Sequence, residues 1–197
     1  MKENFIEAYN ALTDEDAYRL YYRTWFPEDP PRAVLLVIHG MAEHSGRYEN
    51  FAAFCLKRQI AIIVPDLRGH GKNVETPREA GHFADKNGWV LARHDILKMI
   101  EAARHAYPGL PLFLLGHSMG SLLARSVLHS YPLKVNGLLL SGTSASQGLL
   151  GTVGILLARL QKMSKGPAAK AHLHEKLSFG QYNKAFRPNR TAFDWLS

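Results

Sequence analysis

One stretch decides how this chain folds: residues 112–128 read LFLLGHSMGSLLARSVL. The first four residues are all apolar, which indicates a short strand buried on both faces. The last eight, from Ser121 onward, have the apolar spacing of a helix. The residues between them, Gly116-His117-Ser118-Met119-Gly120, must turn the chain sharply from strand to helix, and the glycines are small enough to allow it.

Ser118 stands at the top of this turn. A Gly-x-Ser-x-Gly pattern alone is weak, because chance produces one in roughly every fifteen chains of this length. A strand, a sharp turn at a serine and a helix together form a nucleophile elbow, which lifts the hydroxyl above the sheet. We predict Ser118 as a catalytic nucleophile, with Gly116, His117 and Gly120 supporting the turn. The alternative is a glycine-rich turn without catalysis.

Three more short apolar runs predict further strands, at residues 33–38, at 60–64, and at 138–140 with Val135 ahead of them. Runs that are apolar at every position are typical of parallel strands covered on both faces. Their carboxyl ends are expected to meet at one edge of the sheet, together with Ser118.

Helical patterns lie between these runs, at residues 48–55 and 89–107. Strands that alternate with helices build a doubly wound, mostly parallel α/β sheet. Ahead of it, residues 5–11 and 18–25 predict an antiparallel hairpin joined by a turn at 13–16. Two segments follow from these patterns: a core at 1–146 and a helical lid or cap segment at 147–197, in which residues 148–160 are apolar almost all round.

A nucleophilic serine produces a tetrahedral oxyanion, which requires preorganised hydrogen-bond donors. In an elbow of this kind, one donor is the N–H of the residue after the serine, here Met119. The second comes from the loop after the strand at 33–38, where Gly40 lets the backbone turn and the Met41 N–H is the best candidate. His39 supports this loop. The spacing of His39 and His44 fits no metal motif, so we expect no metal and no cofactor.

The charge is uneven along the chain. The net charge is +7, but residues 1–150 contribute +1 and residues 151–197 contribute +6, without a nucleic-acid motif. We therefore expect no nucleic-acid partner. Cys55 is the only cysteine, which excludes an intrachain disulfide. No apolar run approaches the ~20 residues that span a bilayer, and the first residues are not those of a signal peptide. A cytoplasmic location is expected.

Three motifs together resemble one family. They are VIHGMAEHSGRY at 37–48, DLRGHG at 66–71 and GHSMG at 116–120. In this order and spacing they resemble the monoacylglycerol lipase and lysophospholipase branch of the α/β hydrolases, from about residue 15 to the end of the chain. The resemblance implies an ester hydrolase that acts on a small acyl ester, with an oxyanion N–H from the first motif. The second motif reads better as a structural turn held by Arg68. Asn73 stands where relatives often have serine.

The resemblance also implies a catalytic acid and histidine after the lid. The only candidates downstream, His172, His174 and Asp194, occur in the wrong order and in lid-like sequence. We therefore expect that the triad acid and histidine are not in this chain, that it is inactive alone, and that one sheet edge is uncovered. Alternatives are another acyl substrate, such as a peptide or a small soluble ester, and a non-catalytic hydrolase-like binding protein. The basic lid predicts peripheral contact with anionic membranes.

Overall fold

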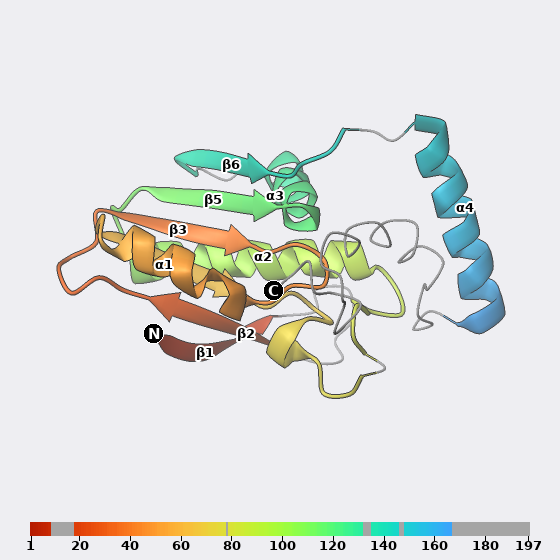
Figure 1. Ribbon diagram of the computed structural model, residues 1–197, viewed down its shortest axis with the longest axis horizontal. Helices are drawn as coiled ribbons and strands as arrows, with labels where there is room; N and C mark the ends of the chain where they lie inside the picture. Colours follow the sequence, from red (N-terminus) through yellow and green to blue (C-terminus); the bar gives the residue numbers. More distant parts are fainter. Residues whose placement is uncertain (9–17, 78, 132–134, 146–147, 167–197) are drawn as a thin grey trace, which may run out of the picture. The chain divides into compact units, whose positions relative to one another are not determined.

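The described strands form a six-stranded sheet in the order β1-β2-β4-β3-β5-β6 (Figure 1). The computed structural model describes residues 1–8, 18–77, 79–131, 135–145 and 148–166. The strands are β1 (Lys2–Ala8), β2 (Tyr18–Trp25), β3 (Ala33–Ile38), β4 (Ile60–Pro65), β5 (Leu112–His117) and β6 (Gly137–Ser141). The four apolar runs are neighbouring parallel strands, as their composition predicts.

The register of the central strands decides where the loops meet. β3 lies between β4 and β5, and Leu35 is opposite both Ile62 and Phe113. At its carboxyl end, Ile38 is opposite Gly116. The loop that follows Ile38 therefore emerges beside the turn that follows β5.

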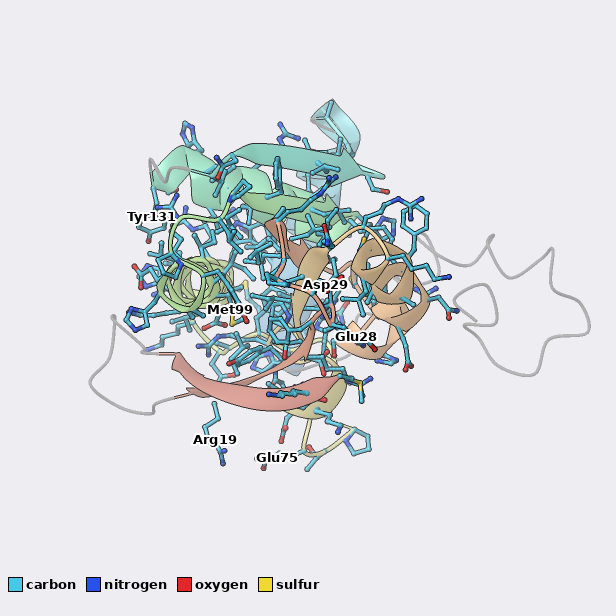
Figure 2. The ribbon with its side chains drawn as sticks, turned by 90° about the vertical axis from the view of Figure 1, so that its left-hand side faces the viewer. Arg19, Glu28, Asp29, Glu75, Met99 and Tyr131 are labelled. Carbon is cyan, nitrogen blue, oxygen red and sulfur yellow. The ribbon has the colours of Figure 1, made fainter. Side chains whose placement is uncertain are left out.

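Helices cover both faces of the sheet (Figure 2). On one face lies α1 (Glu49–Leu56), and on the other lie α2 (Gly88–Ala106) and α3 (Met119–Ser130). Two short 3₁₀ helices, η1 (Ser45–Tyr48) and η2 (Gly71–Asn73), follow β3 and β4. Successive residues of a strand point to opposite faces. Leu35 and Val37 therefore pack with the α1 side, whereas Leu36 and Ile38 join the core under α2, where Met99 is also buried.

β6 differs from the other parallel strands in its exposure. Leu138, Leu139 and Leu140 are 36%, 47% and 40% exposed, and alternate residues of β5 are only half-buried. The prediction that these runs are buried on both faces is wrong for β6. Among the described strands β6 pairs only with β5, at the edge of the sheet, where neighbours are fewer. An uncovered sheet edge is itself one of the expectations from the sequence.

The amino-terminal hairpin is confirmed where the structure describes it. β1 pairs antiparallel with β2, with Phe5 opposite Tyr21, and β2 pairs antiparallel with β4. The first strand begins three residues earlier than the predicted 5–11 and is described up to Ala8; residues 9–11 of the prediction lie outside the described residues. The turn predicted at 13–16 lies outside the described residues.

The chain divides into two compact units, Met1–Ser144 and Ala145–Ser197. In the second unit, the described helix is α4 (Gly148–Lys165), which includes the predicted apolar segment 148–160. Its large side chains Ile155, Leu156, Leu160 and Met163 are exposed. That this unit is a lid or cap stays a prediction. Among the described helices, none combines the length and the apolarity that crossing a bilayer requires.

Candidate active site

Ser118 occupies a backbone conformation that serine seldom adopts. It lies between β5 and α3, with φ 49° and ψ −119°, and its side chain is exposed. For a residue other than glycine, such a conformation costs of order 1–3 kcal/mol and persists only where neighbours impose it. The Ser118 N–H donates to the Ser141 carbonyl at 2.8 Å, and the Ser118 carbonyl accepts from the Ser121 N–H and hydroxyl at 2.9 and 2.6 Å. The predicted elbow is therefore present and is held on both sides.

The two glycines of the motif are required by close backbone approach. A Cβ on Gly120 would lie 2.0 Å from the Ile38 carbonyl oxygen, and one on Gly116 would lie 2.6 Å from the Gly120 carbonyl oxygen. Both neighbours are main-chain atoms of the sheet or of the turn, which cannot move aside cheaply. Because neither position has room for a side chain, α3 can pack directly against the end of β3.

Gly40 brings the loop after β3 against the elbow. A Cβ on this buried glycine would lie 3.2 Å from the Ser118 Cβ and 3.3 Å from the His117 Cδ2. The Gly40 N–H is already used, because it donates to the Glu43 carboxylate at 2.9 Å. The Met41 N–H is the next donor along the loop, and the Met41 side chain is 45% exposed. This arrangement supports the prediction that Met41 supplies an oxyanion donor.

Met119 is the residue predicted to carry the other donor. It is the first residue of α3, and the N–H groups of a first helical turn have no partner within the helix. The partial positive charge at a helix amino terminus also favours an anion there. The N–H groups of Met41 and Met119 thus belong to the two loops that meet at Ser118.

A buried polar layer supports these loops from below. His39 has no exposed surface; its Nδ1 lies 2.7 Å from the Gly40 carbonyl oxygen, and its Nε2 accepts from the Leu67 N–H at 2.9 Å. Burial, and secondarily the neighbouring His70, lower the pKa of His39 to about 4. His39 is therefore neutral at physiological pH, and both ring nitrogens are engaged.

The loop from Asp66 to Gly71 has a structural role. The Asp66 carboxylate accepts from the Ser45 N–H at 2.6 Å and from the Lys72 N–H at 2.8 Å. Arg68 donates two hydrogen bonds to the buried Asp95 of α2, at 2.5 and 2.9 Å. Burial raises the pKa of Asp95, and its bonds to Arg68 oppose that rise.

Asn73 also acts structurally. Its side chain accepts from the Tyr21 N–H at 2.9 Å and donates to the Asp66 carbonyl at 2.5 Å. The amide group therefore ties the end of η2 to β2 and β4, which gives this departure from the family pattern a place in the fold.

His117, the histidine next to Ser118 in the sequence, interacts with residues other than Ser118. The His117 Nδ1 lies 3.2 Å from the Ser141 hydroxyl, and its Nε2 lies 3.8 Å from a Glu43 carboxylate oxygen. His172, His174 and Asp194 lie outside the described residues. Within the described residues, no three histidine, cysteine or acidic side chains converge as a metal site would require.

Glu43 is the site residue that sequence reasoning missed. Its carboxylate is buried next to Gly40 and also accepts from Arg47 and Tyr48. In the sequence, Glu43 is an acidic residue three positions after a loop glycine. That spacing alone does not predict a hydrogen bond to the Gly40 N–H, because the bond depends on the folded loop.

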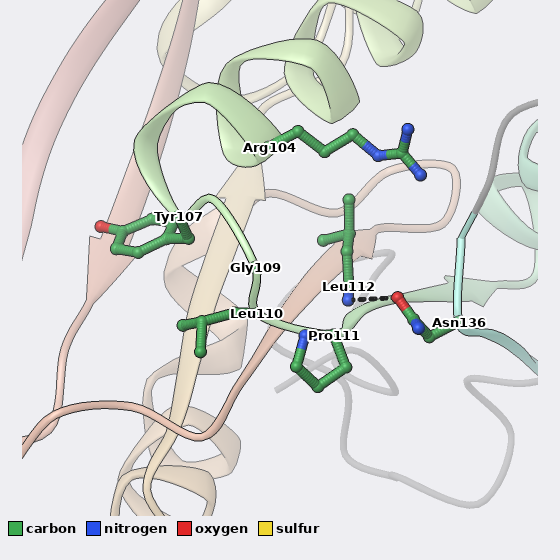
Figure 3. A pocket seen from close by; sticks show the side chains of 7 residues that line it. All are labelled: Arg104, Tyr107, Gly109, Leu110, Pro111, Leu112 and Asn136. Carbon is green, nitrogen blue, oxygen red and sulfur yellow. Dashed lines mark hydrogen bonds between the residues drawn. The ribbon is translucent and has the colours of Figure 1, made fainter.

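A cavity of about 400 Å³ lies at the other end of the strands (Figure 3). Seven residues line it: Arg104, Tyr107, Gly109, Leu110, Pro111, Leu112 and Asn136. Leu112 is the first residue of β5, whereas Ser118 follows the last. The cavity is therefore not part of the site around Ser118.

Known proteins are similar to this chain in sequence. The chain is 37% identical to human monoglyceride lipase over 113 residues, which cover 57% of this chain and 35% of that protein. It is 36% identical over 101 residues to the Bacillus subtilis phospholipase YtpA, covering 51% of this chain and 36% of that one. The matched segments thus span about a third of the length of each of these curated relatives.

Solved structures agree on the fold. A thermostable carboxyl esterase from Bacillus coagulans, in complex with glycerol, superposes with a TM-score of 0.77 at 26% identity over 99% of this chain and 61% of that one. A sequence profile described as serine aminopeptidase S33 matches residues 29–195. The chain has the α/β-hydrolase fold and belongs to the serine aminopeptidase S33 family.

Proposed function

We propose that the natural protein hydrolyses carboxylic esters through an acyl-enzyme intermediate on Ser118. The observation that carries this proposal is the strained, exposed Ser118 between β5 and α3, with Gly40 of a second loop against it. Strain at an exposed serine has no benefit for folding, so it favours a catalytic role. The names of the relatives, a monoglyceride lipase, a phospholipase and a carboxyl esterase, support ester chemistry.

The proposed reaction has two halves. The Ser118 Oγ attacks the ester carbonyl, the N–H groups of Met41 and Met119 stabilise the oxyanion, and the alcohol leaves with a proton from the general acid. Water then attacks the acyl-enzyme, and the carboxylic acid is released as Ser118 regains its proton.

The general base is proposed to be a histidine from outside these 197 residues, oriented by an acid that is also outside them. His117 is the described histidine next to Ser118, but it faces Ser141 and Glu43. A serine hydroxyl without a base is a poor nucleophile at neutral pH. We therefore expect the 197-residue chain alone to be inactive.

The substrate class proposed is a monoacylglycerol- or lysophospholipid-like ester. The family description names a serine aminopeptidase, which supports a peptide as the second candidate. Hydrolysis of an ester and of a peptide can use the same nucleophile elbow, so only measured turnover of each substrate distinguishes the two candidates. Hydrolysis of monooleoylglycerol without release of amines from aminoacyl substrates would favour the ester.

Peripheral membrane contact is proposed for the second unit. Exposed apolar side chains of α4 occur in a segment, 151–197, whose net charge is +6. Such a combination suits anionic bilayer surfaces, at ~1 kcal/mol per well-placed basic residue. Co-sedimentation with vesicles should increase with their anionic fraction and decrease with salt; binding that depends on neither would contradict the electrostatic part.

The decisive experiment is Ser118→Ala in the natural protein. We expect kcat to fall by at least about 10⁴-fold with little change in KM, because only binding and the oxyanion donors remain. A fluorophosphonate probe should label the wild type at Ser118 and leave both the variant and the isolated 197-residue chain unlabelled. Near-normal turnover in the variant would rule out the mechanism, and rapid labelling of the short chain would show that it contains a base.

A further inference from the structure

The two peptide groups on either side of the Gly40 Cα are each held by a buried side chain. The Gly40 carbonyl oxygen lies 2.7 Å from the His39 Nδ1. The Gly40 N–H, one peptide earlier, donates to the Glu43 carboxylate at 2.9 Å. The loop is thus fixed on both sides of the Gly40 Cα, the atom that faces Ser118.

The tautomer of His39 follows from its backbone partners. The Leu67 N–H can only donate, so the His39 Nε2 at 2.9 Å must be the unprotonated acceptor. The proton therefore resides on Nδ1, which donates it to the Gly40 carbonyl oxygen. The lowered pKa of His39 agrees with this neutral form.

The direction of the Met41 N–H is a consequence of that bond. In a trans peptide the C=O and the N–H lie in one plane and point in opposite directions. Anchoring the Gly40 carbonyl oxygen on His39 therefore aims the Met41 N–H away from the buried layer. We propose that His39 and Glu43 are positioning residues that preorganise the Gly40–Met41 peptide as an oxyanion donor for Ser118. This inference rests on the proposed function.

Glu43 is built to stay in place. One of its carboxylate oxygens accepts from the Gly40 N–H and from the Tyr48 hydroxyl, at 2.9 and 3.1 Å, and the other accepts from Arg47. Burial raises the pKa of Tyr48, so its hydroxyl remains a donor. A buried carboxylate with three donors is rigid, and it leaves the Met41 N–H as the next donor for a ligand.

The test compares paired variants of the natural protein. His39→Ala removes the donor to Gly40, whereas His39→Asn keeps an N–H near the Nδ1 position. Glu43→Ala removes the acceptor, whereas Glu43→Gln keeps an oxygen at the same length. Matched controls are His105→Ala in α2 and Glu28→Ala in the loop after β2, and both residues are exposed. Glu28 is labelled in Figure 2.

The catalytic readouts are kcat, KM and the affinity of a trifluoromethyl ketone, which forms a tetrahedral adduct with the serine. We expect each alanine variant to lose about 100-fold in kcat and in ketone affinity, with KM within about threefold, as for a displaced oxyanion donor. His39→Asn and Glu43→Gln should recover at least about tenfold. Unchanged kcat and ketone affinity in folded alanine variants would overturn the inference.

Two further measurements keep the test decisive. If the alanine variants fail to fold, Glu43→Asp replaces them, because aspartate keeps the charge but is one methylene too short. The kcat of Glu43→Asp should be lower than that of Glu43→Gln. Equal kcat values would contradict the proposal. Hydrogen exchange of a peptide covering residues 39–44 should accelerate in the variants and not in the controls. Exchange needs no activity, so an inactive wild type would overturn the proposed function while exchange still decides whether these side chains hold the loop.

Discussion

Two loops meet at Ser118, and different forces hold them. The turn Gly116–Gly120 is held by backbone hydrogen bonds of Ser118 and by close backbone packing, because a single methyl group at either glycine would overlap main-chain atoms. The loop His39–Glu43 is held by side-chain hydrogen bonds, from the imidazole and from the carboxylate. A Cβ on Gly40 would meet its nearest neighbours only at 3.2–3.4 Å. Steric exclusion therefore fixes the two glycines of the elbow, whereas side-chain hydrogen bonds fix the conformation of the neighbouring loop.

This difference explains what can be recognised in a sequence. Close backbone packing requires glycine at defined positions, so it can be recognised in the sequence as a Gly-x-Ser-x-Gly motif. A hydrogen-bond clamp requires only that an acceptor reach one N–H, and many residues at many positions can do so. Substitution of the glycines and protonation of His39 should distinguish the two kinds of support.

The largest effect is expected from Gly120→Ala. Its methyl group would lie 2.0 Å from the Ile38 carbonyl oxygen, so either β3 or α3 must shift. We expect the free energy of unfolding to decrease by at least about 3 kcal/mol, measured by urea denaturation. Leu122→Ala, at an exposed position of the same helix, is the control and should change stability far less. A wild-type urea midpoint for Gly120→Ala would show that the elbow is not sterically closed.

Acid should weaken the polar loop next. His39 has a pKa of about 4 when folded and 6.5 when unfolded, so the unfolded chain binds more protons between these values. Stability is therefore retained above about pH 6.5 and lost as the pH falls toward 4. At about 1.4 kcal/mol per pH unit, His39 contributes about 3 kcal/mol to this loss.

Urea denaturation at pH 7, 5.5 and 4.5 measures this loss, with His39→Asn as the reference that cannot titrate. The groups around His39 are His70, Asp66 and Glu43, and they remain in both proteins. Burial lowers the pKa of His70 as well. His70 therefore adds the same pH dependence of the free energy of unfolding to the wild type and to His39→Asn. Equal pH dependence in the two proteins would contradict the role given to His39.

The smallest effect on stability is expected from Gly40→Ala. Its methyl group needs its neighbours to move by only a few tenths of an ångström. The free energy of unfolding should therefore change by less than about 1 kcal/mol. The same methyl presses on the Ser118 Cβ, and kcat should fall about tenfold because the nucleophile is displaced. Calorimetry and steady-state kinetics on one preparation test this split; a large loss of stability with normal kcat would reverse the comparison.

Much of the fold could be predicted because its rules are local. The run at 33–38 coincides with β3, and the elbow lies where the Gly-x-Ser-x-Gly motif places it. The sequence predicted an uncovered sheet edge but not that β6 forms it, because Leu138–Leu140 read the same as a central strand. Whether an apolar run is covered depends on its position in the sheet, which the run itself does not encode.

The sequence by itself determined the parallel sheet, the sharp turn at Ser118 and the glycines that permit it, since apolar periodicity and the strand–turn–helix pattern are set by residues close in the chain. Only the tertiary structure decided that Glu43 binds the Gly40 N–H and that His39 links the Gly40 carbonyl to Leu67, 28 positions further along. Hydrogen bonds depend on distance and direction, and the groups of this loop and of Leu67 acquire these only after the strands have been brought into register.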